Sequence, residues 1–438
     1  MAFIVTLLQF LLSLTILVVI HEFGHFLLAR LFKIRVEKFY VFFNPWFSLF
    51  KYKPKNCDTT FGIGWLPVGG YVKIAGMIDE SMDTEQMKHP VQDWEFRSKP
   101  AWQRFLVMIA GVTFNFILAI IIYSAISFHY GDQYIAMQDV KTGMEFSPAA
   151  KKAGFRDGDI LLRADDTHLE AFNEETFRAI INAEQVTVLR DGKEVSLNMP
   201  DDLMQQIMQG NKGFANFRVP FVVDSVIAGS RAEMAGLKAK DSIISVGDST
   251  SAYMAHCIDV FSQHKNLNLN ITVMRAGVPV HLQITPDHDG KIGVYMKRIN
   301  KFYPVRTKKY TFWESIPHGI QRGVKKLTGY ASDMKYVFTQ EGAQNLGGFI
   351  SIGRLFPYPF DAEIFWEMTA YISIILAFIN LLPIPGLDGG HIMFVLYEMI
   401  TRKKPSQKAL IRAQMIGMFL LFMLLIYVNM NDVFRLFN

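Results

Sequence analysis

Long apolar stretches occur at four places along the 438-residue chain, and segments of mixed polar and apolar positions separate them. Each stretch is long enough to cross about 30 Å of hydrocarbon as a helix. The pattern predicts a multi-pass α-helical membrane protein with four transmembrane helices. The stretches cover residues 3–31, 105–128, 364–382 and 410–428, within the segments 1–31, 104–129, 360–400 and 408–430.

Lysine and arginine residues lie on one side of the predicted spans. Residues 30–104 carry twelve basic and eight acidic residues, whereas residues 1–20 carry neither kind, and the short connection after the third stretch is again basic. Because cytoplasmic loops are enriched in lysine and arginine, both basic segments are expected in the cytoplasm. The termini and the region between the second and third stretches should then face outward. The first stretch lacks the basic start and cleavage site of a secretory signal, so we expect it to remain as a helix.

The outward region contains an internal repeat. The segment around Gly154 and Asp159 recurs 82 residues later around Gly236 and Asp241. A strand pattern and a tight turn follow each copy, which predicts two small α+β domains. They cover residues 130–215 and 216–300.

The repeated segments resemble the signature of bacterial PDZ domains, although Lys240 stands where the second copy should have a glycine. We therefore expect an inserted pair of PDZ-like domains. Such domains generally accept extended peptides at a sheet edge, so the resemblance implies contact with polypeptides. The alternative is that they only obstruct access to the membrane part.

Residues 302–342, within the segment 301–350, combine basic and aromatic residues with apolar residues at near-helical spacing. This pattern predicts an amphipathic helix. The helix could lie on the outer membrane surface, or it could pack on the second PDZ-like domain.

The composition agrees with a membrane protein, because 50% of the residues are hydrophobic and only 19% are charged. The basic loops account for much of the net charge of +5, which suits contact with an anionic lipid bilayer and gives no indication of nucleic-acid binding. Cys57 and Cys257 fall on opposite predicted sides of the membrane. Neither an intramolecular disulfide nor a cysteine metal cluster is expected.

An HExxH motif, His21-Glu22-Phe-Gly-His25, lies in the first apolar stretch. In a helix, residues four apart share one face, so both imidazoles can bind one Zn²⁺ while the glutamate reaches a metal-bound water. Ionisable side chains inside hydrocarbon are costly and usually functional. The alternative is a helix end at the membrane interface, since Arg30 follows closely.

A catalytic zinc needs a third protein ligand, and the segment from Asn380 to His391 is the best source. Its two prolines and three glycines must break an apolar stretch that is too long for one span, and a broken helix at membrane depth is tolerated where it lines a cavity. Counting residues from the outer membrane surface places Asp388 near the depth of the HExxH motif. From spacing alone, Asp388 and His391 are both candidate ligands.

HExxH in the first span and N-x-x-P-x-P-x-L-D-G, from Asn380 to Gly389, in a later span together resemble the site-2 protease family of intramembrane metalloproteases. The resemblance implies that His21, His25 and Asp388 bind Zn²⁺, that Glu22 is the general acid/base, and that His391 is a neighbour. It also implies that Asn380 contacts the substrate backbone. The alternative for Asn380 is an amide that caps the broken helix.

Residues 61–75, in the cytoplasmic loop region 32–103, are too few for a helical span and too apolar for a free loop. They predict a β-hairpin that re-enters the membrane, and the family resemblance supports it. An exposed strand edge there could hold an unwound substrate by backbone hydrogen bonds. The expected substrate-binding residues are Gly62, Gly64, Gly69, Gly70 and Tyr71.

The second span departs from the family pattern, because Val112 follows Gly111 where the family often has a proline. Asn115, later in this motif, could face the active site or bind a neighbouring helix.

The resemblance implies an enzyme of the bacterial inner (cytoplasmic) membrane with periplasmic termini and PDZ-like domains and a site toward the cytoplasm. Its substrates would be single-span membrane proteins such as anti-sigma factors, with signal-peptide remnants as a further candidate, and the PDZ-like domains would act as a size filter. A metal transporter and a membrane-anchored PDZ scaffold are the alternatives. The sequence predicts neither the individual substrate nor the oligomeric state.

Overall fold

The computed structural model describes the chain except for residues 1, 68, 78–88, 211–212, 251–252 and 438, and for residues 2, 345, 436 and 437 it describes the backbone alone. The chain divides into two compact units. The first unit combines Met1–Gly131 with Lys309–Asn438, and the second unit is Asp132–Lys308.

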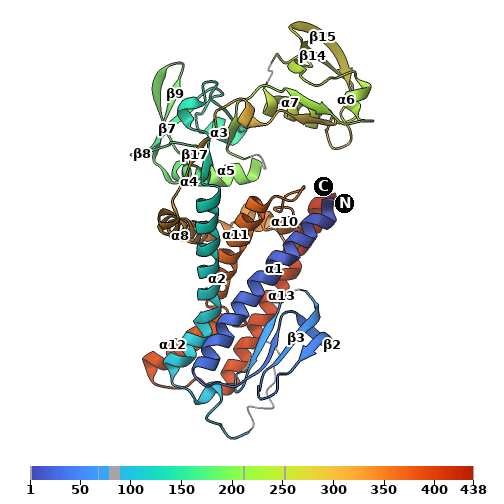
Figure 1. Ribbon diagram of the computed structural model, residues 1–438. Coiled ribbons are helices and arrows are strands. Elements are labelled where there is room, and N and C mark those ends of the chain that lie inside the picture. The colour runs from blue at the N-terminus through green and yellow to red at the C-terminus, as the bar shows by residue number, and fades with distance from the viewer. Residues whose placement is uncertain (1, 68, 78–88, 211–212, 251–252, 438) are drawn as a thin grey trace. The chain divides into compact units, whose positions relative to one another are not determined.

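The first unit is mainly helical (Figure 1). Within the described residues, four of its helices are long and apolar enough to cross a membrane, which confirms the prediction of a multi-pass protein. The helices of this unit are α1 (Ala2–Leu31), η2 (Phe96–Ser98), α2 (Ala101–His129), α8 (Phe312–Val337), α9 (Gln340–Asn345), α10 (Phe349–Gly353), α11 (Ala362–Leu381), α12 (Asp388–Thr401) and α13 (Gln407–Phe437). The four candidate spans are Phe3–Leu31, Ala101–His129, Ala362–Leu381 and Gln407–Arg435.

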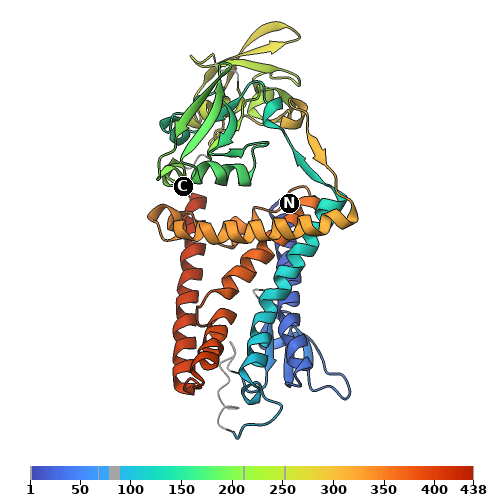
Figure 2. The ribbon, with the colours of Figure 1, turned by 90° about the vertical axis from the view of Figure 1, so that its left-hand side faces the viewer.

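Helix α2 is central in this unit, because α1, α8, α11 and α12 all pack against it. A Cβ atom on Gly24 of α1 would lie 2.7 Å from the carbonyl oxygen of Ala110, so glycine allows α1 and α2 to meet at backbone contact. Helix α8 runs across the ends of the membrane-type helices (Figure 2). Its buried face includes Gly319 and Gly323, while Phe312 and Trp313 are exposed.

The third apolar stretch is interrupted between α11 and α12. Pro383 and Pro385 lie in this interruption, where neither can supply the N–H that a continuous helix requires. Gly386 has a φ of 103°, a conformation that glycine adopts without steric cost. The chain therefore turns sharply immediately before Asp388, the first residue of α12.

A four-stranded sheet in the first unit has the order β2-β3-β1-β4. The prediction that residues 61–75 pair as a hairpin is wrong, because β3 and β4 do not pair with each other. They lie on opposite sides of β1, where Tyr40 is opposite both Gly62 and Tyr71. The local pattern revealed two strands and a glycine turn, but not the long-range insertion of β1 between them. Residue 68 of the predicted hairpin lies outside the described residues. The strands are β1 (Val36–Tyr40), β2 (Phe43–Tyr52), β3 (Thr60–Leu66) and β4 (Tyr71–Ile74).

The second unit contains short strands, short helices and two hydrophobic cores. One core is built mainly from residues 137–219 and the other from residues 221–292. Its helices are η3 (Met137–Asp139), α3 (Pro148–Lys152), α4 (Glu174–Asn182), α5 (Leu203–Gly210), α6 (Arg231–Met234), α7 (Met254–Gln263) and η4 (Ile299–Lys301). Its strands are β5 (Asp132–Tyr134), β6 (Met144–Phe146), β7 (Ile160–Ala164), β8 (Thr167–His168), β9 (Gln185–Arg190), β10 (Lys193–Asn198), β11 (Ala215–Phe217), β12 (Val223–Val226), β13 (Ser242–Val246), β14 (Leu269–Arg275), β15 (Val278–Ile284), β16 (Val294–Met296) and β17 (Arg306–Lys308).

The strands of the second unit form a four-stranded sheet of order β10-β9-β7-β8, a three-stranded sheet of order β13-β14-β15, and the pairs β11-β6, β12-β16 and β17-β5. This combination of strands and helices is an α+β arrangement. The PDZ-like identity of the two halves remains a prediction.

The repeated motif makes the same contacts twice. Arg190 donates from Nε and Nη2 to Asp159 at 2.8 and 2.7 Å, and Arg275 does the same to Asp241 at the same distances. Each arginine also donates to a backbone carbonyl 2.8 Å away, that of Gly154 or Gly236. In both copies, an arginine of a strand thus ties down the segment that follows the short helix.

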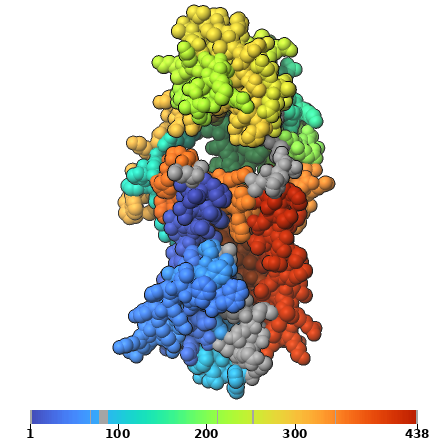
Figure 3. Space-filling view, turned by 90° about the vertical axis from the view of Figure 1, so that its right-hand side faces the viewer, coloured from blue at the N-terminus to red at the C-terminus, as the bar shows by residue number. Residues whose placement is uncertain are grey.

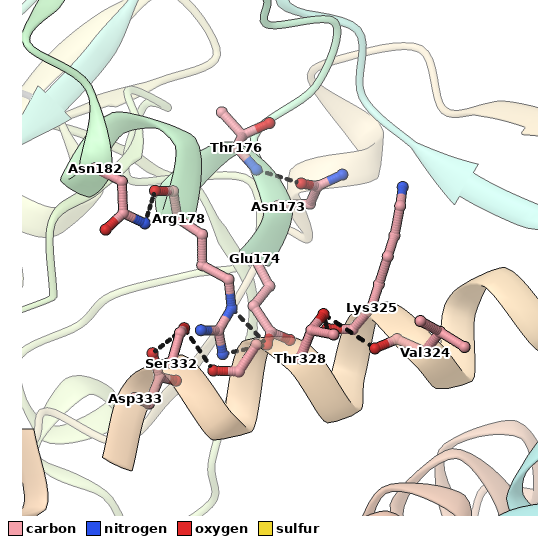
Figure 4. A network of polar contacts seen from close by, with 11 residues as sticks. Asn173, Glu174, Thr176, Arg178, Asn182, Val324, Lys325, Thr328, Ser332 and Asp333 are labelled. Atoms are coloured by element: carbon pink, nitrogen blue, oxygen red, sulfur yellow. Dashed lines mark hydrogen bonds and ion pairs between the residues drawn. The ribbon is translucent and has the colours of Figure 1, made fainter. Parts of the chain in front are cut away.

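Local capping fixes several helix ends. In α4, Asn173 Oδ1 accepts a hydrogen bond of 2.9 Å from the Thr176 N–H, and Arg178 pairs with Glu174 one turn away (Figure 4). In α8, Thr311 and Glu314 form a capping box at the first turn. These contacts satisfy N–H groups that have no partner within their own helix.

Candidate active site

The HExxH residues lie on one face of α1, as their spacing predicts. The Nε2 atoms of His21 and His25 are 3.3 Å apart, and both side chains are buried. Close contact between α1 and α2 surrounds them with apolar protein. The sequence therefore brings two imidazoles to one point within a candidate membrane span.

Asp388 completes a triangle with these imidazoles. Its Oδ2 atom lies 3.1 Å from His21 Nε2 and 3.2 Å from His25 Nε2. A tetrahedral zinc with bonds of about 2.0–2.1 Å has ligand atoms about 3.3 Å apart, so the three atoms have the spacing of one tetrahedral face. Within the described residues, they form the one group of three or more candidate ligand side chains.

Three observations test whether these residues fit Zn²⁺. Asp388 Oδ2 is buried but accepts no hydrogen bond in the described part of the chain. A Cβ on Gly111 would contact His25 Nε2 and lie 2.8 Å from His21 Nε2, so the glycine keeps space open beside the imidazoles. Two imidazoles and one carboxylate are also a usual donor set for catalytic zinc. The residues fit the metal.

Residues of α2 and α11 surround the histidines. His25 Nδ1 lies 2.8 Å from the carbonyl oxygen of Val107, and His21 Nδ1 lies 3.2 Å from Asn115 Nδ2. Ser373 donates a 2.7 Å hydrogen bond to the carbonyl oxygen of Asn115. Asn115 thus both faces the site and binds a neighbouring helix. Sequence reasoning missed Val107, because a backbone carbonyl leaves no signal in residue type.

A cavity of about 640 Å³ lies against the triangle. Residues of α1, α11, α12, α13 and the sheet line it, and Figure 3 shows the surface hollowed between α1 and α13. Most of the predicted site residues are among its lining. They are His21, Glu22, His25, Gly69, Gly70, Tyr71, Asn380, Asp388 and His391.

Two predicted substrate-binding residues do not line this cavity. A Cβ on Gly62 would contact the Tyr40 ring, and one on Gly64 would contact the backbone oxygens of Phe42 and Phe43. Both glycines therefore permit close packing inside the sheet. Neither glycine is among the residues that line the cavity, so their predicted contact with a substrate stays a prediction.

Glu22 and Asn380 both line the cavity beside the triangle. Glu22 lines the cavity, and its carboxylate lies close to the backbone of Val72 in β4. Asn380 is in the last turn of α11, and its amide makes no hydrogen bond with the described residues. The amide therefore caps neither half of the broken helix there. It can be directed toward a molecule in the cavity.

The chain matches Peptidase family M50 over residues 9–424 and belongs to this family. It is 28% identical over 458 residues to a predicted zinc metalloprotease of Vibrio cholerae, with 98% of each chain covered. It is 25% identical over 457 residues to Metalloprotease MmpA of Caulobacter vibrioides, covering 99% of this chain and 96% of that one. It is also 28% identical over 467 residues to the Regulator of sigma E protease of Haemophilus influenzae, with 100% of each covered.

The family match confirms the resemblance to site-2 proteases. The protein is a membrane protein and a zinc metalloprotease. This favours the enzyme over the transporter and the scaffold.

Proposed function

We propose that the protein hydrolyses a peptide bond within the transmembrane segment of single-span membrane proteins. One observation carries the proposal: the triangle of His21, His25 and Asp388 borders a cavity between helices of membrane-spanning type. In this proposal the three residues are the metal ligands, Glu22 is the general acid/base, and His391 is a neighbour that does not bind the metal.

Zn²⁺ held by these residues would supply Lewis-acid chemistry that activates water and polarises a peptide carbonyl. Glu22 accepts the proton of the attacking water and delivers it to the leaving amine nitrogen. Asn380 donates a hydrogen bond from Nδ2 to the carbonyl oxygen, where negative charge develops. The apolar cavity wall limits the entry of competing water.

The edge strand β4 holds the substrate in an extended form. It is the outer strand of its sheet, and Gly70, Tyr71 and Val72 line the cavity. A transmembrane helix hides its backbone groups in its own hydrogen bonds, so cleavage requires local unwinding. Strand addition at β4 would replace the lost hydrogen bonds. Gly69 lines the cavity just before this edge strand, and in this proposal the sheet enters the membrane from the cytoplasmic side.

The protein resides in the bacterial inner membrane, with its termini and the domains 130–215 and 216–300 in the periplasm. The basic composition of residues 30–104 supports this orientation. The two domains are PDZ-like and form a size filter that admits substrates with small periplasmic portions. The name of the Haemophilus influenzae relative supports an anti-sigma factor as the substrate type.

Glu22→Gln tests the proposal in full-length protein in detergent or proteoliposomes. The variant should cut a single-span substrate about 10²–10⁴-fold more slowly, because an amide cannot accept the proton. It should keep its zinc, since Glu22 is not a ligand in the proposal. Glu194→Gln, a surface variant in the second unit, is the matched control and should cleave as wild type does. Cleavage by Glu22→Gln at the wild-type rate would refute the proposal.

The size filter needs a separate test. Substrates that share one transmembrane segment and carry either a short or a bulky periplasmic domain should be cut at different rates. Equal rates would refute the filter and leave the proposed chemistry intact.

A further inference from the structure

Helix α2 presents three residues to the two histidines at four-residue spacing. Val107, Gly111 and Asn115 lie on one helical face, and all three are buried. Val107 offers a carbonyl oxygen to His25, Gly111 leaves space for both rings, and Asn115 faces His21. One side of α2 therefore contacts both imidazoles at once.

Hydrogen bonding determines which ring nitrogen of each histidine can bind a metal. His25 Nδ1 is 2.8 Å from the Val107 carbonyl, which can only accept, so Nδ1 carries the proton. His25 Nε2 then has a free lone pair directed toward the triangle. If His21 also binds through Nε2, its Nδ1 must likewise carry a proton and needs an acceptor.

Asn115 supplies that acceptor if its amide is turned over. Asn115 Nδ2 lies 3.2 Å from His21 Nδ1, while Oδ1 is buried with no hydrogen-bond partner in the described residues. With a protonated Nδ1, two donors face each other and the acceptor is left unsatisfied. A half-turn of the amide exchanges its nitrogen and oxygen and places Oδ1 opposite Nδ1–H.

We propose that Asn115 is a positioning residue for His21, with Oδ1 accepting from Nδ1–H when the metal is bound. This inference rests on the proposed ligand role of His21. The contact fixes the protonated nitrogen and the ring orientation, as a hydrogen-bond partner behind a zinc ligand commonly does. Ser373 holds the Asn115 backbone in place from α11.

The position of Asn115 excludes direct contact with substrate in this structure. Its side chain is fully buried and is not among the residues that line the cavity. Asn380, in contrast, does line the cavity. Two asparagines near one metal site thus serve different partners, with Asn115 acting on a ligand and Asn380 on the substrate.

Zinc affinity of the full-length protein, measured by competition with a chelator, tests the proposal through two substitutions of similar size. Asn115→Leu removes the acceptor and should weaken zinc binding about 10–100-fold. Asn115→Asp keeps an acceptor of the same shape and should bind zinc at least as tightly as wild type. If the Asn115 amide only stabilised the fold, Asn115→Asp should bind zinc more weakly than Asn115→Leu. The reason is that burying an unpartnered carboxylate costs more free energy than burying an apolar side chain. Cobalt substitution adds a spectroscopic readout, in which Asn115→Asp should shift the metal absorption bands.

Two further variants make every outcome decisive. Thr113→Val, on an exposed position of α2, leaves Asn115 and its contacts unchanged, so its zinc affinity should match wild type. His25→Ala should lose zinc, and its failure to do so would refute the proposed metal site itself. If His25→Ala loses zinc but both Asn115 variants bind it as wild type does, only the positioning role is overturned. Should Asn115→Leu not fold, weaker zinc binding by Asn115→Asp, or an unshifted cobalt spectrum, would overturn it.

Discussion

Aspartates with buried carboxylate oxygens occur in both units of this protein, but the groups around these oxygens differ. In the second unit, Asp159 and Asp241 are 1% and 0% exposed, and each accepts hydrogen bonds from an arginine and a backbone N–H. In the first unit, Asp388 Oδ2 is buried against two imidazoles and accepts no hydrogen bond within the described residues. The two carboxylates of the second unit are thus surrounded by hydrogen-bond donors, whereas Asp388 Oδ2 has the two imidazoles beside it and accepts no hydrogen bond from them.

The difference has a physical meaning. Burying a charge without a partner costs several kcal/mol, so folded proteins normally pair it. Asp159 and Asp241 satisfy this requirement with groups of the chain and stabilise the fold. Asp388 has two imidazoles beside it instead, and in the proposed site a Zn²⁺ bound by all three residues balances its charge. An unsatisfied buried carboxylate is therefore a stronger sign of function than a buried carboxylate alone.

The largest predicted effect comes from Asp388→Asn. Loss of the charged ligand should lower zinc affinity at least 100-fold and abolish cleavage. The metal-free variant should be no less stable than metal-free wild type, because the substitution removes an uncompensated charge. Zinc analysis and thermal unfolding with a chelator present measure both effects. A clearly lower unfolding temperature of the metal-free variant would mean that Asp388 stabilises the fold, as Asp241 does.

Removal of Arg275 should show the opposite behaviour in the second unit. Arg275→Met leaves the buried Asp241 without its main partner and should destabilise this half by about 3 kcal/mol, while zinc binding is unchanged. Hydrogen exchange across residues 221–296 measures the change. The double variant Asp241→Leu/Arg275→Met should recover much of the loss, since it removes both charges. No recovery would indicate that packing of the arginine, rather than charge pairing, is the main contribution.

The sequence predicted the helices that carry His21, His25 and Asp388 better than it predicted the sheet beside them. His21 and His25 share a face because helical spacing is local, and Pro383 and Pro385 break the third stretch wherever it lies. The position of β1 between β3 and β4 was not predictable, because strand pairing depends on long-range contacts rather than on local pattern. The sequence did not predict the roles of Gly111 and Val107 for another reason. The space beside Gly111 and the position of the Val107 carbonyl depend on the fold and not on side-chain chemistry.

Acid should break the ion pair between Asp241 and Arg275 without any substitution. Burial alone would raise the pKa of Asp241, but the hydrogen bonds from Arg275 and the Lys238 N–H hold this pKa below its ordinary value. The carboxylate is then more acidic in the folded than in the unfolded chain, so its stabilising contribution is present above about pH 4 and is lost as the pH falls further. Hydrogen exchange over residues 221–296 between pH 6 and pH 3 should show this loss. Arg275→Met should flatten the dependence, and an equally steep dependence in that variant would assign it to other groups.

The smallest predicted effect concerns Lys240, which stands in the second copy where the first copy has Gly158. Gly158 in the first copy and Lys240 in the second both have a positive φ, 99° and 71°. Glycine adopts this conformation freely, whereas lysine pays for it sterically, so Lys240→Gly should stabilise the second half by about 1 kcal/mol. The gain is reduced by the greater freedom of glycine in the unfolded chain. Gly158→Ala is the matched control and should destabilise the first half. If Lys240→Gly also destabilises, side-chain contacts of Lys240 outweigh its backbone strain, and the second copy has replaced the glycine for a reason beyond the turn.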